Sequence, residues 1–321
     1  MKKIAVLGAG GFVGRSLTEY LSQDGKAFEV IPVTRKQADL LDAPAVEKFF
    51  KDLKPDAVIN CASCGGSRKN GYSDGDDVAD KNCRIFENVE KALEDLPGTA
   101  HFIFGSGAQY DKSRPLVKVS ESDIGVNIPG DPYGLGKLKI AERIRADGRE
   151  KTCMPVIFGL FGPYEDYTYK FISNACAKVL LGMDIVINRN VKFDYLYIDD
   201  FCGIMETLLT DVLCGRRLPH RIFNITPDES VTLERIGGIV KNISGKNPAV
   251  TVLNGGMSPE YTGNNALLRE NLGREYRFLN YEESVARLYR NLERRLPELD
   301  AESIKADAAL KYCVNKTSDN N

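Results

Sequence analysis

The sequence predicts an α/β protein with a doubly wound parallel sheet, in which helices cover both faces of the sheet. Along roughly the first 160 residues, short apolar runs alternate with segments that have the periodicity of amphipathic helices. The apolar runs lack the polar–apolar alternation of half-exposed strands, as is typical of parallel strands buried on both faces. A glycine-rich turn, "GAGGFVG" at residues 8–14, joins the first of these runs to the first helical segment. Together these features indicate a Rossmann-type sheet with ligands beyond the carboxyl ends of its strands.

The predicted strands and helices alternate from the N-terminus onward. Strands are expected at residues 3–8, 28–34, 56–62, 101–106 and 154–162, and helices at 14–23, 43–53, 77–96 and from Tyr133. After residue 163 the pattern changes to longer irregular stretches with aromatic clusters, such as "FDYLYIDDF". We therefore expect a dinucleotide-binding Rossmann domain over residues 1–163, to which 194–226 return. A smaller C-terminal α/β substrate-binding lobe is expected over 164–193 and 227–321.

Composition and charge exclude several classes of protein. The chain has 321 residues and a net charge of −2, with acidic and basic residues interspersed, so no nucleic-acid-binding surface is indicated. No apolar run is long enough to span a bilayer, and glycine interrupts the N-terminal run before it reaches signal-sequence length. We expect a cytoplasmic protein with no membrane or nucleic-acid partner. Cys61 and Cys64 form a C-x-x-C pair, but no second pair or histidine cluster completes a metal site, and none is predicted.

The glycine turn is the first candidate binding site. Glycine residues allow backbone N–H groups to approach a pyrophosphate, and the N-terminus of the following helix contributes partial positive charge. The position of the turn, after the first strand and before the first helix, favours a dinucleotide cofactor. We predict that Gly8, Gly11, Phe12 and Val13 contact this cofactor. The alternative is a tight strand–helix turn that holds no ligand.

The end of the second strand indicates which dinucleotide is bound. NAD enzymes usually place an acidic side chain here for the ribose 2′-hydroxyl, whereas an arginine suits a 2′-phosphate. Arg35 stands at this point with Lys36 beside it, and Asp39 and Leu40 follow in the same loop. We predict that Arg35, Asp39 and Leu40 contact NADP, with NAD as the alternative. In the other interpretation both cations are solvated, and Asp39 faces the ribose or the adenine.

Three residues form a candidate proton-transfer site. The strand at 101–106 places Ser106 at the carboxyl edge of the sheet, and Tyr133 enters the same crevice from the next long helix, with Lys137 one turn further. A phenol has a pKa of about 10, and a lysine cation about 4 Å away at an effective dielectric of 20 stabilises its phenolate by roughly 4 kcal/mol. We predict that Ser106, Tyr133 and Lys137 are catalytic and that Tyr133 and Lys137 also bind the cofactor. Taken alone, Ser106 is more often a structural strand-end hydroxyl.

These motifs resemble a known family. "GAGGFVG", "NCAS", "YGLGK", "FGLFGP" and "FDYLYIDDF" are together similar to the extended short-chain dehydrogenase/reductases, the nucleotide-sugar epimerase/dehydratase family, over essentially residues 1 to 290. Among its members, the chain most resembles GDP-fucose synthases and sugar-nucleotide 4-ketoreductases. The resemblance implies that Tyr133 is the acid/base, that Lys137 binds the cofactor ribose and that Ser106 binds the sugar oxygen. It places Ala62 and Ser63, from the third-strand motif, on the cofactor, and it implies a nucleotide-sugar substrate and a homodimer.

Departures from the family pattern narrow the predicted reaction. Gly107 and Ala108 stand where sugar dehydratases carry an acidic pair, and Ala108 also replaces the cysteine of epimerising GDP-fucose synthases. Dehydration and epimerisation beside the ketone are therefore not expected. Gly159 replaces the family asparagine, and Phe193 stands where an arginine often reaches the substrate phosphates.

Substrate contacts are predicted at four positions, with the second lobe expected to supply part of them. These positions are Ser106, Gly107, Asn174 and Lys192, and Lys170 or Arg189 could also replace the missing arginine. The segment "PEYTGNN" at 259–265 has the polar, turn-like character of a substrate loop.

Three functions agree with these residues. The first is NADPH-dependent reduction of a nucleotide-linked 4-keto-6-deoxy sugar to the 4-hydroxy sugar. The second is an NAD-dependent nucleotide-sugar 4-epimerase, which would use the same catalytic residues and keep its cofactor bound. The third is a non-catalytic NADP-binding sensor or scaffold with the same fold.

Overall fold

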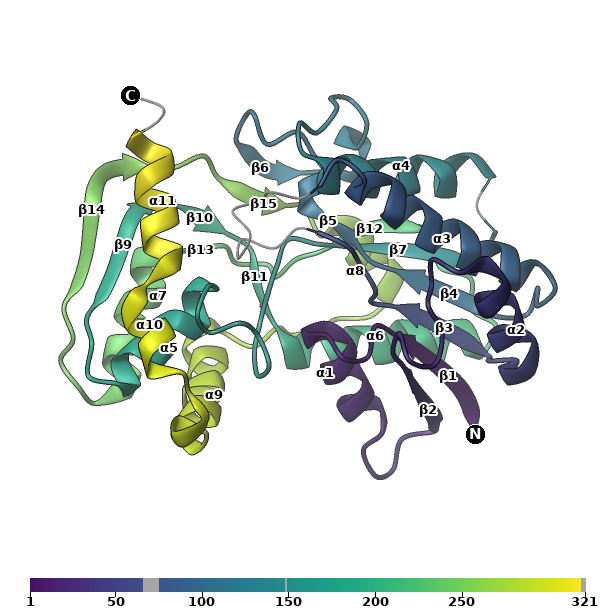
Figure 1. The fold of residues 1–321 in the computed structure, drawn as a ribbon, viewed down its shortest axis with the longest axis horizontal. Helices are drawn as coiled ribbons and strands as arrows, with labels where there is room; N and C mark the ends of the chain where they lie inside the picture. The colour runs from purple at the N-terminus through teal and green to yellow at the C-terminus, as the bar shows by residue number, and fades with distance from the viewer. Residues whose placement is uncertain (66–74, 148, 319–321) are drawn as a thin grey trace.

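A parallel sheet forms the larger part of the molecule, on the right of Figure 1. In spatial order its strands are β12 (Ile222–Ile225), β7 (Thr152–Ile157), β4 (Ala100–Ile103), β3 (Ala57–Asn60), β1 (Lys2–Leu7) and β2 (Phe28–Val33), and β5 (Gly105–Ser106) pairs with β7. This computed structural model describes residues 1–65, 75–147 and 149–318. The chain runs from β1 outward to β2 and then crosses to β3 on the other side of β1, so a topological switch point lies between β1 and β3. The doubly wound fold predicted from the sequence is confirmed.

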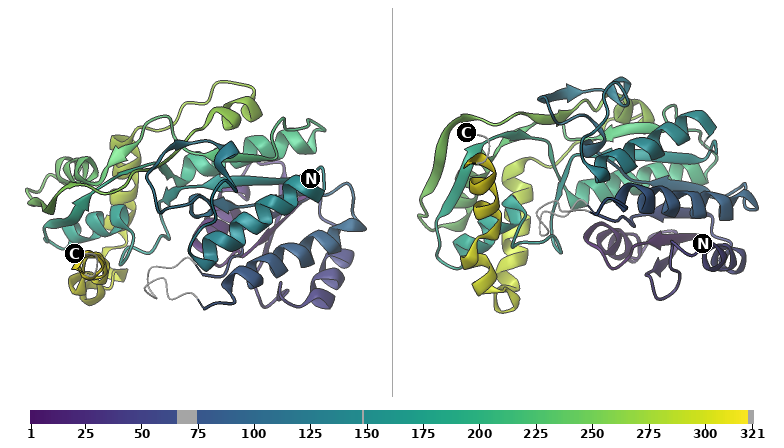
Figure 2. Two further views of the ribbon diagram at one scale, coloured as in Figure 1. Left: turned by 90° about the horizontal axis from the view of Figure 1, so that it is seen from above. Right: turned by 45° about the horizontal axis from the view of Figure 1, so that its top comes forward.

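Helices cover both faces of this sheet (Figures 1 and 2). One face carries α2 (Ala43–Leu53), α3 (Val78–Glu94) and α4 (Pro132–Asp147), and the other carries α1 (Phe12–Leu21) and α6 (Ile198–Leu213). Side chains of β1 alternate between the two faces: Leu7 packs in the cluster that includes α2 and α3, whereas Val6 packs in the cluster that includes α1 and α6. The strands are therefore apolar along their whole length because both of their faces are buried.

Two predicted strands are interrupted in the structure. The run at 101–106 divides into β4 and β5 at Phe104, whose carbonyl oxygen accepts a hydrogen bond from a lysine side chain. The run at 154–162 divides at Phe158, after which β8 (Gly159–Phe161) leaves the large sheet and pairs with β11 (Tyr195–Tyr197). Both interruptions lie at the carboxyl edge of the sheet, where they turn the chain toward the smaller lobe.

The smaller lobe lies on the left of Figure 1 and contains short strands and several helices. A four-stranded sheet has the order β13 (Val231–Thr232), β10 (Lys192–Phe193), β15 (Tyr261–Gly263) and β6 (Leu116–Val119), and β9 (Ile185–Asn190) pairs with β14 (Val250–Met257). The helices are α5 (Phe171–Leu180), α7 (Leu233–Ser244), α9 (Tyr281–Arg294), α10 (Ala301–Ala306) and α11 (Ala308–Ser318). In contrast, α8 (Ala266–Leu272) packs against β12 and α6 of the larger part. Strand β6 precedes α4 in the chain, and the sequence pattern did not indicate it. The division of the chain at residues 163, 194 and 226 stays a prediction.

Membrane-spanning helices and metal-binding clusters are both absent from the part of the chain that the structure describes. None of the helices within 1–65, 75–147 and 149–318 has the length and apolar content needed to span a bilayer. Over the same ranges, no group of three or more histidine, cysteine, aspartate or glutamate side chains is arranged to hold a metal ion.

A buried carboxylate connects the strands of the smaller lobe. Asp194, between β10 and β11, is 1% exposed. Its Oδ1 accepts hydrogen bonds from Ser230 Oγ at 2.5 Å and Lys118 Nζ at 3.3 Å, and its Oδ2 accepts one from the backbone N–H of Gly263 at 2.9 Å. These partners lie on β6, on β15 and just before β13, so a single side chain holds the four-stranded sheet together.

We expect Asp194→Ala to lower the free energy of unfolding by about 2 to 4 kcal/mol, because three donors, among them the buried N–H of Gly263, lose their acceptor. The free energy of unfolding should fall less in Asp194→Asn, since the amide oxygen of asparagine can still accept the hydrogen bond from Gly263. Urea unfolding measures both effects, with Asp24→Ala as the control at an exposed position. A value for Asp194→Ala equal to that of the control would contradict the role of this carboxylate.

Candidate active site

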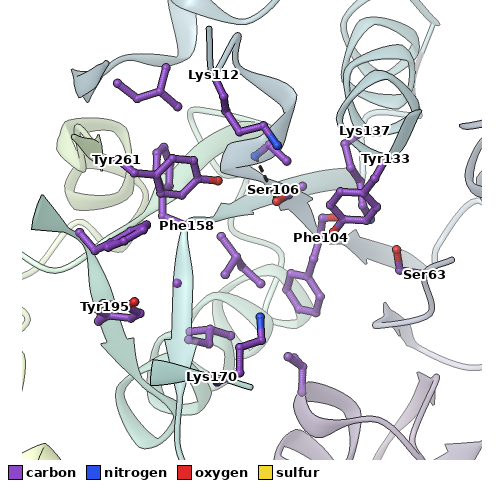
Figure 3. A pocket seen from close by; sticks show the side chains of 18 of the residues that line it. Ser63, Phe104, Ser106, Lys112, Tyr133, Lys137, Phe158, Lys170, Tyr195 and Tyr261 are labelled. Carbon is purple, nitrogen blue, oxygen red and sulfur yellow. Dashed lines mark hydrogen bonds between the residues drawn. The ribbon is translucent and has the colours of Figure 1, made fainter. Parts of the chain in front are cut away.

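A cavity of about 540 Å³ opens at the carboxyl edge of the large sheet, between the sheet and the smaller lobe. Part of the predicted site lines it, namely Phe12, Val13, Ala62, Ser63, Ser106, Tyr133 and Lys137. Figure 3 shows Ser106, Tyr133 and Lys137 on one side of this cavity and aromatic side chains of the lobe on the other. The remaining predicted residues do not line it: Gly8, Gly11, Arg35, Asp39, Leu40, Gly107, Asn174 and Lys192.

The glycine turn is built as a cradle beside the cavity. Gly8 has a φ of +72°, and a Cβ there would lie 2.8 Å from the backbone nitrogen of Ala62, so β1 and the chain after β3 approach closely. The N–H of Gly11 donates to the carbonyl of Gly8 at 3.0 Å, and Gly11 begins α1 without a capping side chain. The backbone N–H groups of the first turn of α1 thus have no side-chain cap. This arrangement fits the pyrophosphate of a dinucleotide.

The segment after β3 is held in place by two asparagines. Asn60 Oδ1 accepts from the backbone N–H of Ala62 at 3.1 Å. Asn82, buried in α3, donates to the carbonyl of Cys64 at 2.8 Å and accepts from its N–H at 3.0 Å. Asn60 also lines the cavity, and its Nδ2 is buried with no hydrogen-bond partner among the described residues. An unpartnered buried donor at this place is consistent with a polar ligand in the cavity.

The loop after β2 lies outside the cavity but next to the glycine turn. The N–H of Ala9 donates to the carbonyl of Val33 at 3.1 Å, which joins the turn to the end of β2. Arg35 is exposed, and Asp39, also exposed, accepts from the N–H of Leu41 at 3.1 Å. Leu40 is buried, and its carbonyl accepts from Asn88 of α3 at 2.9 Å. An elongated ligand that extends from the cavity across the glycine turn would therefore reach this loop.

Local contacts at the start of α4 direct Tyr133 toward Ser106. Asp131 Oδ1 accepts from the N–H of Gly134 at 2.8 Å and so caps the helix. A Cβ at Gly134 would overlap the carbonyl oxygen of Ala108, so only glycine allows this close approach. Ser106 Oγ accepts from the N–H of Ala108 at 3.2 Å, which leaves the hydroxyl proton of Ser106 available to a ligand.

Lys137 is a buried cation beside Tyr133. Its side chain is 4% exposed, and its Nζ donates to the carbonyl of Phe104 at 2.8 Å. The same Nζ lies 5.7 Å from the centroid of the Tyr133 ring. Burial lowers the pKa of Lys137 to about 8, because the interior favours the neutral amine. Lys137 is therefore mostly charged at neutral pH, and it titrates much closer to neutrality than an exposed lysine.

The cavity also contains residues that the sequence did not single out. Among them are Lys112, Phe158 and Glu165. Glu165 accepts a hydrogen bond from Ser173 Oγ, and burial raises the pKa of its carboxyl to about 8, so it is largely protonated at neutral pH. Lys112 pairs with Asp131 at 2.8 Å at the edge of the cavity. Only the three-dimensional arrangement brings these residues together, and no local motif marks Lys112 or Glu165.

Of the four predicted substrate residues, Ser106 lines the cavity and the other three do not. Lys192 pairs with Glu260 at 3.5 Å, and Asn174 is buried and donates to the carbonyl of Tyr167 at 3.0 Å. Gly107 is buried beneath the hydroxyl group of Tyr261. In contrast, the cavity wall does contain Lys170, Phe193 and residues 259–261 of the predicted substrate loop.

Comparisons with known proteins agree with this geometry. Residues 4–225 match the model of the NAD dependent epimerase/dehydratase family. GDP-L-fucose synthase of Escherichia coli (strain K12) is 26% identical over 174 residues, a match that spans 52% of this chain and 53% of that protein. GDP-L-colitose synthase of Yersinia pseudotuberculosis is 24% identical over 263 residues, which are 76% of this chain and 82% of that protein.

The fold is shared with solved structures. One is a GDP-mannoheptose C4 reductase from Campylobacter jejuni with NADP bound, which superposes with a TM-score of 0.72 at 20% identity. The superposition covers 90% of this chain and 97% of the reductase.

We expect Lys137→Met to raise the free energy of unfolding of the cofactor-free protein at pH 7 by about 2 kcal/mol. The pKa of Lys137 falls from 10.5 to about 8 on folding, so its charged form lowers the free energy of unfolding by about 3 kcal/mol. Methionine removes this cost but also loses the hydrogen bond to Phe104, which is worth about 1 kcal/mol. Between pH 8 and 10.5 the unfolded lysine keeps a proton that the folded one has lost, so stability of the wild type rises relative to the variant.

Urea unfolding of both proteins at several pH values measures this difference, with Lys139→Met as the control at an exposed position of the same helix. The difference in the free energy of unfolding between the wild type and Lys137→Met should become smaller as the pH rises from 8 to 10.5. A difference in the free energy of unfolding that does not change with pH would mean that burial does not destabilise the Lys137 cation.

Proposed function

The chain belongs to the NAD dependent epimerase/dehydratase family, and from this premise we propose that it is an NADPH-dependent reductase of a nucleotide-linked 4-keto-6-deoxy sugar. The observation that carries the proposal is the convergence of Ser106, Tyr133 and Lys137 on one cavity beside the glycine turn. The two residues after Ser106 are Gly107 and Ala108, which have no group that could remove a proton from a carbon of the sugar. The site is therefore equipped to interconvert a ketone and an alcohol.

Each of the three side chains has a distinct role in the proposed reaction. NADPH, when bound, supplies the hydride that reduces the ketone carbon. Ser106 donates a hydrogen bond from its hydroxyl group to the ketone oxygen, on which negative charge develops. Tyr133 then gives this oxygen its phenol proton. The Lys137 ammonium, 5.7 Å from the centre of the Tyr133 ring, stabilises the resulting phenolate by about 3 kcal/mol at an effective dielectric of 20, with the phenolate charge placed at the ring centre.

The proposed cofactor is NADP rather than NAD. The exposed guanidinium of Arg35 at the end of β2 suits a 2′-phosphate, and no acidic side chain occupies that position. We place the pyrophosphate on Gly8, Gly11, Phe12 and Val13. Asp39 and Leu40 are assigned to the adenosine end, and Ala62, Ser63, Tyr133 and Lys137 to the nicotinamide end. The GDP-mannoheptose C4 reductase of the same fold, which has NADP bound, supports this choice.

The partners of the protein are part of the proposal. The cavity of about 540 Å³ holds the sugar end of a nucleotide sugar, with the rest of the substrate extending toward the lobe. A homodimer is proposed through α3 and α4, which lie side by side on the outside of the molecule (Figure 2).

Tyr133→Phe should lower kcat for reduction of a nucleotide-linked 4-keto-6-deoxy sugar by about 10²- to 10⁴-fold, because the proton donor is lost. NADPH affinity should change little, since the ring remains. Steady-state NADPH consumption and fluorescence titration measure the two quantities. Tyr312→Phe is the matched control, because Tyr312 belongs to a second Tyr-x-x-x-Lys sequence outside the cavity. Equal kcat values for the wild type and Tyr133→Phe would remove the mechanism.

Arg35→Ser should weaken NADPH binding at least tenfold, about 1.4 kcal/mol, and leave NADH binding within a factor of two. The reason is that only NADPH carries the 2′-phosphate that Arg35 is proposed to hold. Isothermal titration at low ionic strength gives both constants, with Lys51→Ser as the control for loss of an exposed cation. NAD retained tightly in the purified wild-type protein would instead favour the 4-epimerase.

A further inference from the structure

Four aromatic side chains form one continuous wall of the cavity, which we call the aromatic wall: Phe158, Tyr261, Phe193 and Tyr195. Phe158 lies 5.2 Å from Tyr261 between ring centroids, and Tyr261 lies 5.5 Å from Phe193. Phe193 in turn lies 5.1 Å from Tyr195. The rings come from the segment between β7 and β8 and from β10, β11 and β15. Segments that are far apart in the sequence therefore contribute to a single surface.

Glycine residues make room for three of these rings. A Cβ at Gly107 would collide with the hydroxyl group of Tyr261. A Cβ at Gly263 would lie 2.7 Å from the ring of Phe158, and one at Gly159 would lie 3.0 Å from the ring of Tyr195. Any larger residue would displace a ring from the wall, so the glycines and the rings form one packed unit.

The aromatic wall also accounts for the departures from the family pattern. Gly107, Gly159 and Phe193 all stand where the resemblance implies polar or charged residues. In the structure, Gly107 and Gly159 make room for rings of the wall, and Phe193 contacts two of the other rings. The three departures therefore have one structural result, in which aromatic rings, two of them with hydroxyl groups, take the place of the polar and charged side chains of the family pattern.

The wall begins next to the proposed reaction centre. Gly107, over which the Tyr261 hydroxyl packs, directly follows Ser106 in the chain. Figure 3 shows Tyr261 directed toward Ser106, with Phe158 beside it and Tyr195 further from Ser106. If Ser106 holds the oxygen at carbon 4 of the sugar, the substituents on the two neighbouring carbons face the nearest rings.

We propose that the aromatic wall selects keto sugars that have hydrogen rather than a hydroxyl group at carbon 3, and methyl rather than hydroxymethyl at carbon 5. This inference rests on the proposed function. A carbon–hydrogen face buries apolar surface against the rings, whereas a hydroxyl group there loses its hydrogen bonds to water. Aromatic side chains pack well against flat apolar groups, and a missing or added group in such a pocket changes affinity by roughly 10- to 200-fold.

Binding of matched ligand pairs tests this selection without turnover. The protein saturated with NADPH is titrated calorimetrically with nucleotide-linked 4-hydroxy sugars, which a reduced cofactor leaves unchanged. The members of a pair differ at one carbon, with hydrogen against hydroxyl at carbon 3 or methyl against hydroxymethyl at carbon 5. We expect the less hydroxylated member to bind at least tenfold more tightly.

Variants of Tyr261 assign the preference to the wall. Tyr261→Phe keeps the ring and should keep the ratio of affinities within a factor of two. Tyr261→Asn removes the ring and should reduce the ratio below threefold, with NADPH affinity and thermal unfolding as checks of the fold. Phe193→Asn provides a second removal of a ring if Tyr261→Asn does not fold.

Two negative results have different meanings. Equal binding of both members of each pair, or an unchanged ratio in Tyr261→Asn, overturns the selection by the wall and leaves the reductase proposal intact. Failure to bind any nucleotide sugar overturns the proposed function and this inference together.

Discussion

The proposed chemistry of this protein depends on the hydrogen bond between the Lys137 ammonium and the Phe104 carbonyl, at 2.8 Å. A charged lysine inside a protein loses hydration, and here its pKa falls to about 8 in consequence. The interruption between β4 and β5 turns one carbonyl out of the strand ladder and provides the acceptor that keeps the cation in place. Tyr133 and Ser106 then lie beside a positive charge in a partly enclosed cavity, where electrostatic interactions are stronger than in bulk water.

The smaller lobe completes this site with a different kind of surface. The sheet edge supplies the polar groups that handle a proton, and the opposite side of the cavity carries the four rings of the aromatic wall, most of them from the lobe. Asp194 joins the strands from which several of these rings project, so the stability of the lobe and the shape of the cavity depend on the same buried carboxylate. A cavity with one polar side and one aromatic side favours a ligand with the same asymmetry.

Local features of the sequence were sufficient for the fold and for part of the candidate site. The glycine turn and the spacing of Tyr133 and Lys137 place their groups through the geometry of a single turn or helix, so they could be recognised without a structure. The apolar run at 101–106 contains no signal for the interruption at Phe104, because the partner of that carbonyl lies 33 residues further along the chain. Lys112 and Glu165 reach the cavity only through long-range packing, and an isolated basic or acidic residue carries no local mark of function.

Isotope transfer tests the central claim most directly. NADPH that carries deuterium at the transferable position of its nicotinamide is incubated with the protein and a nucleotide-linked 4-keto-6-deoxy sugar, and the product is examined by mass spectrometry. The account predicts that the sugar gains one deuterium at carbon 4 and that NADP is released. A reduced sugar without deuterium, or a sugar inverted at carbon 4 while the cofactor remains bound and unchanged in amount, would contradict it.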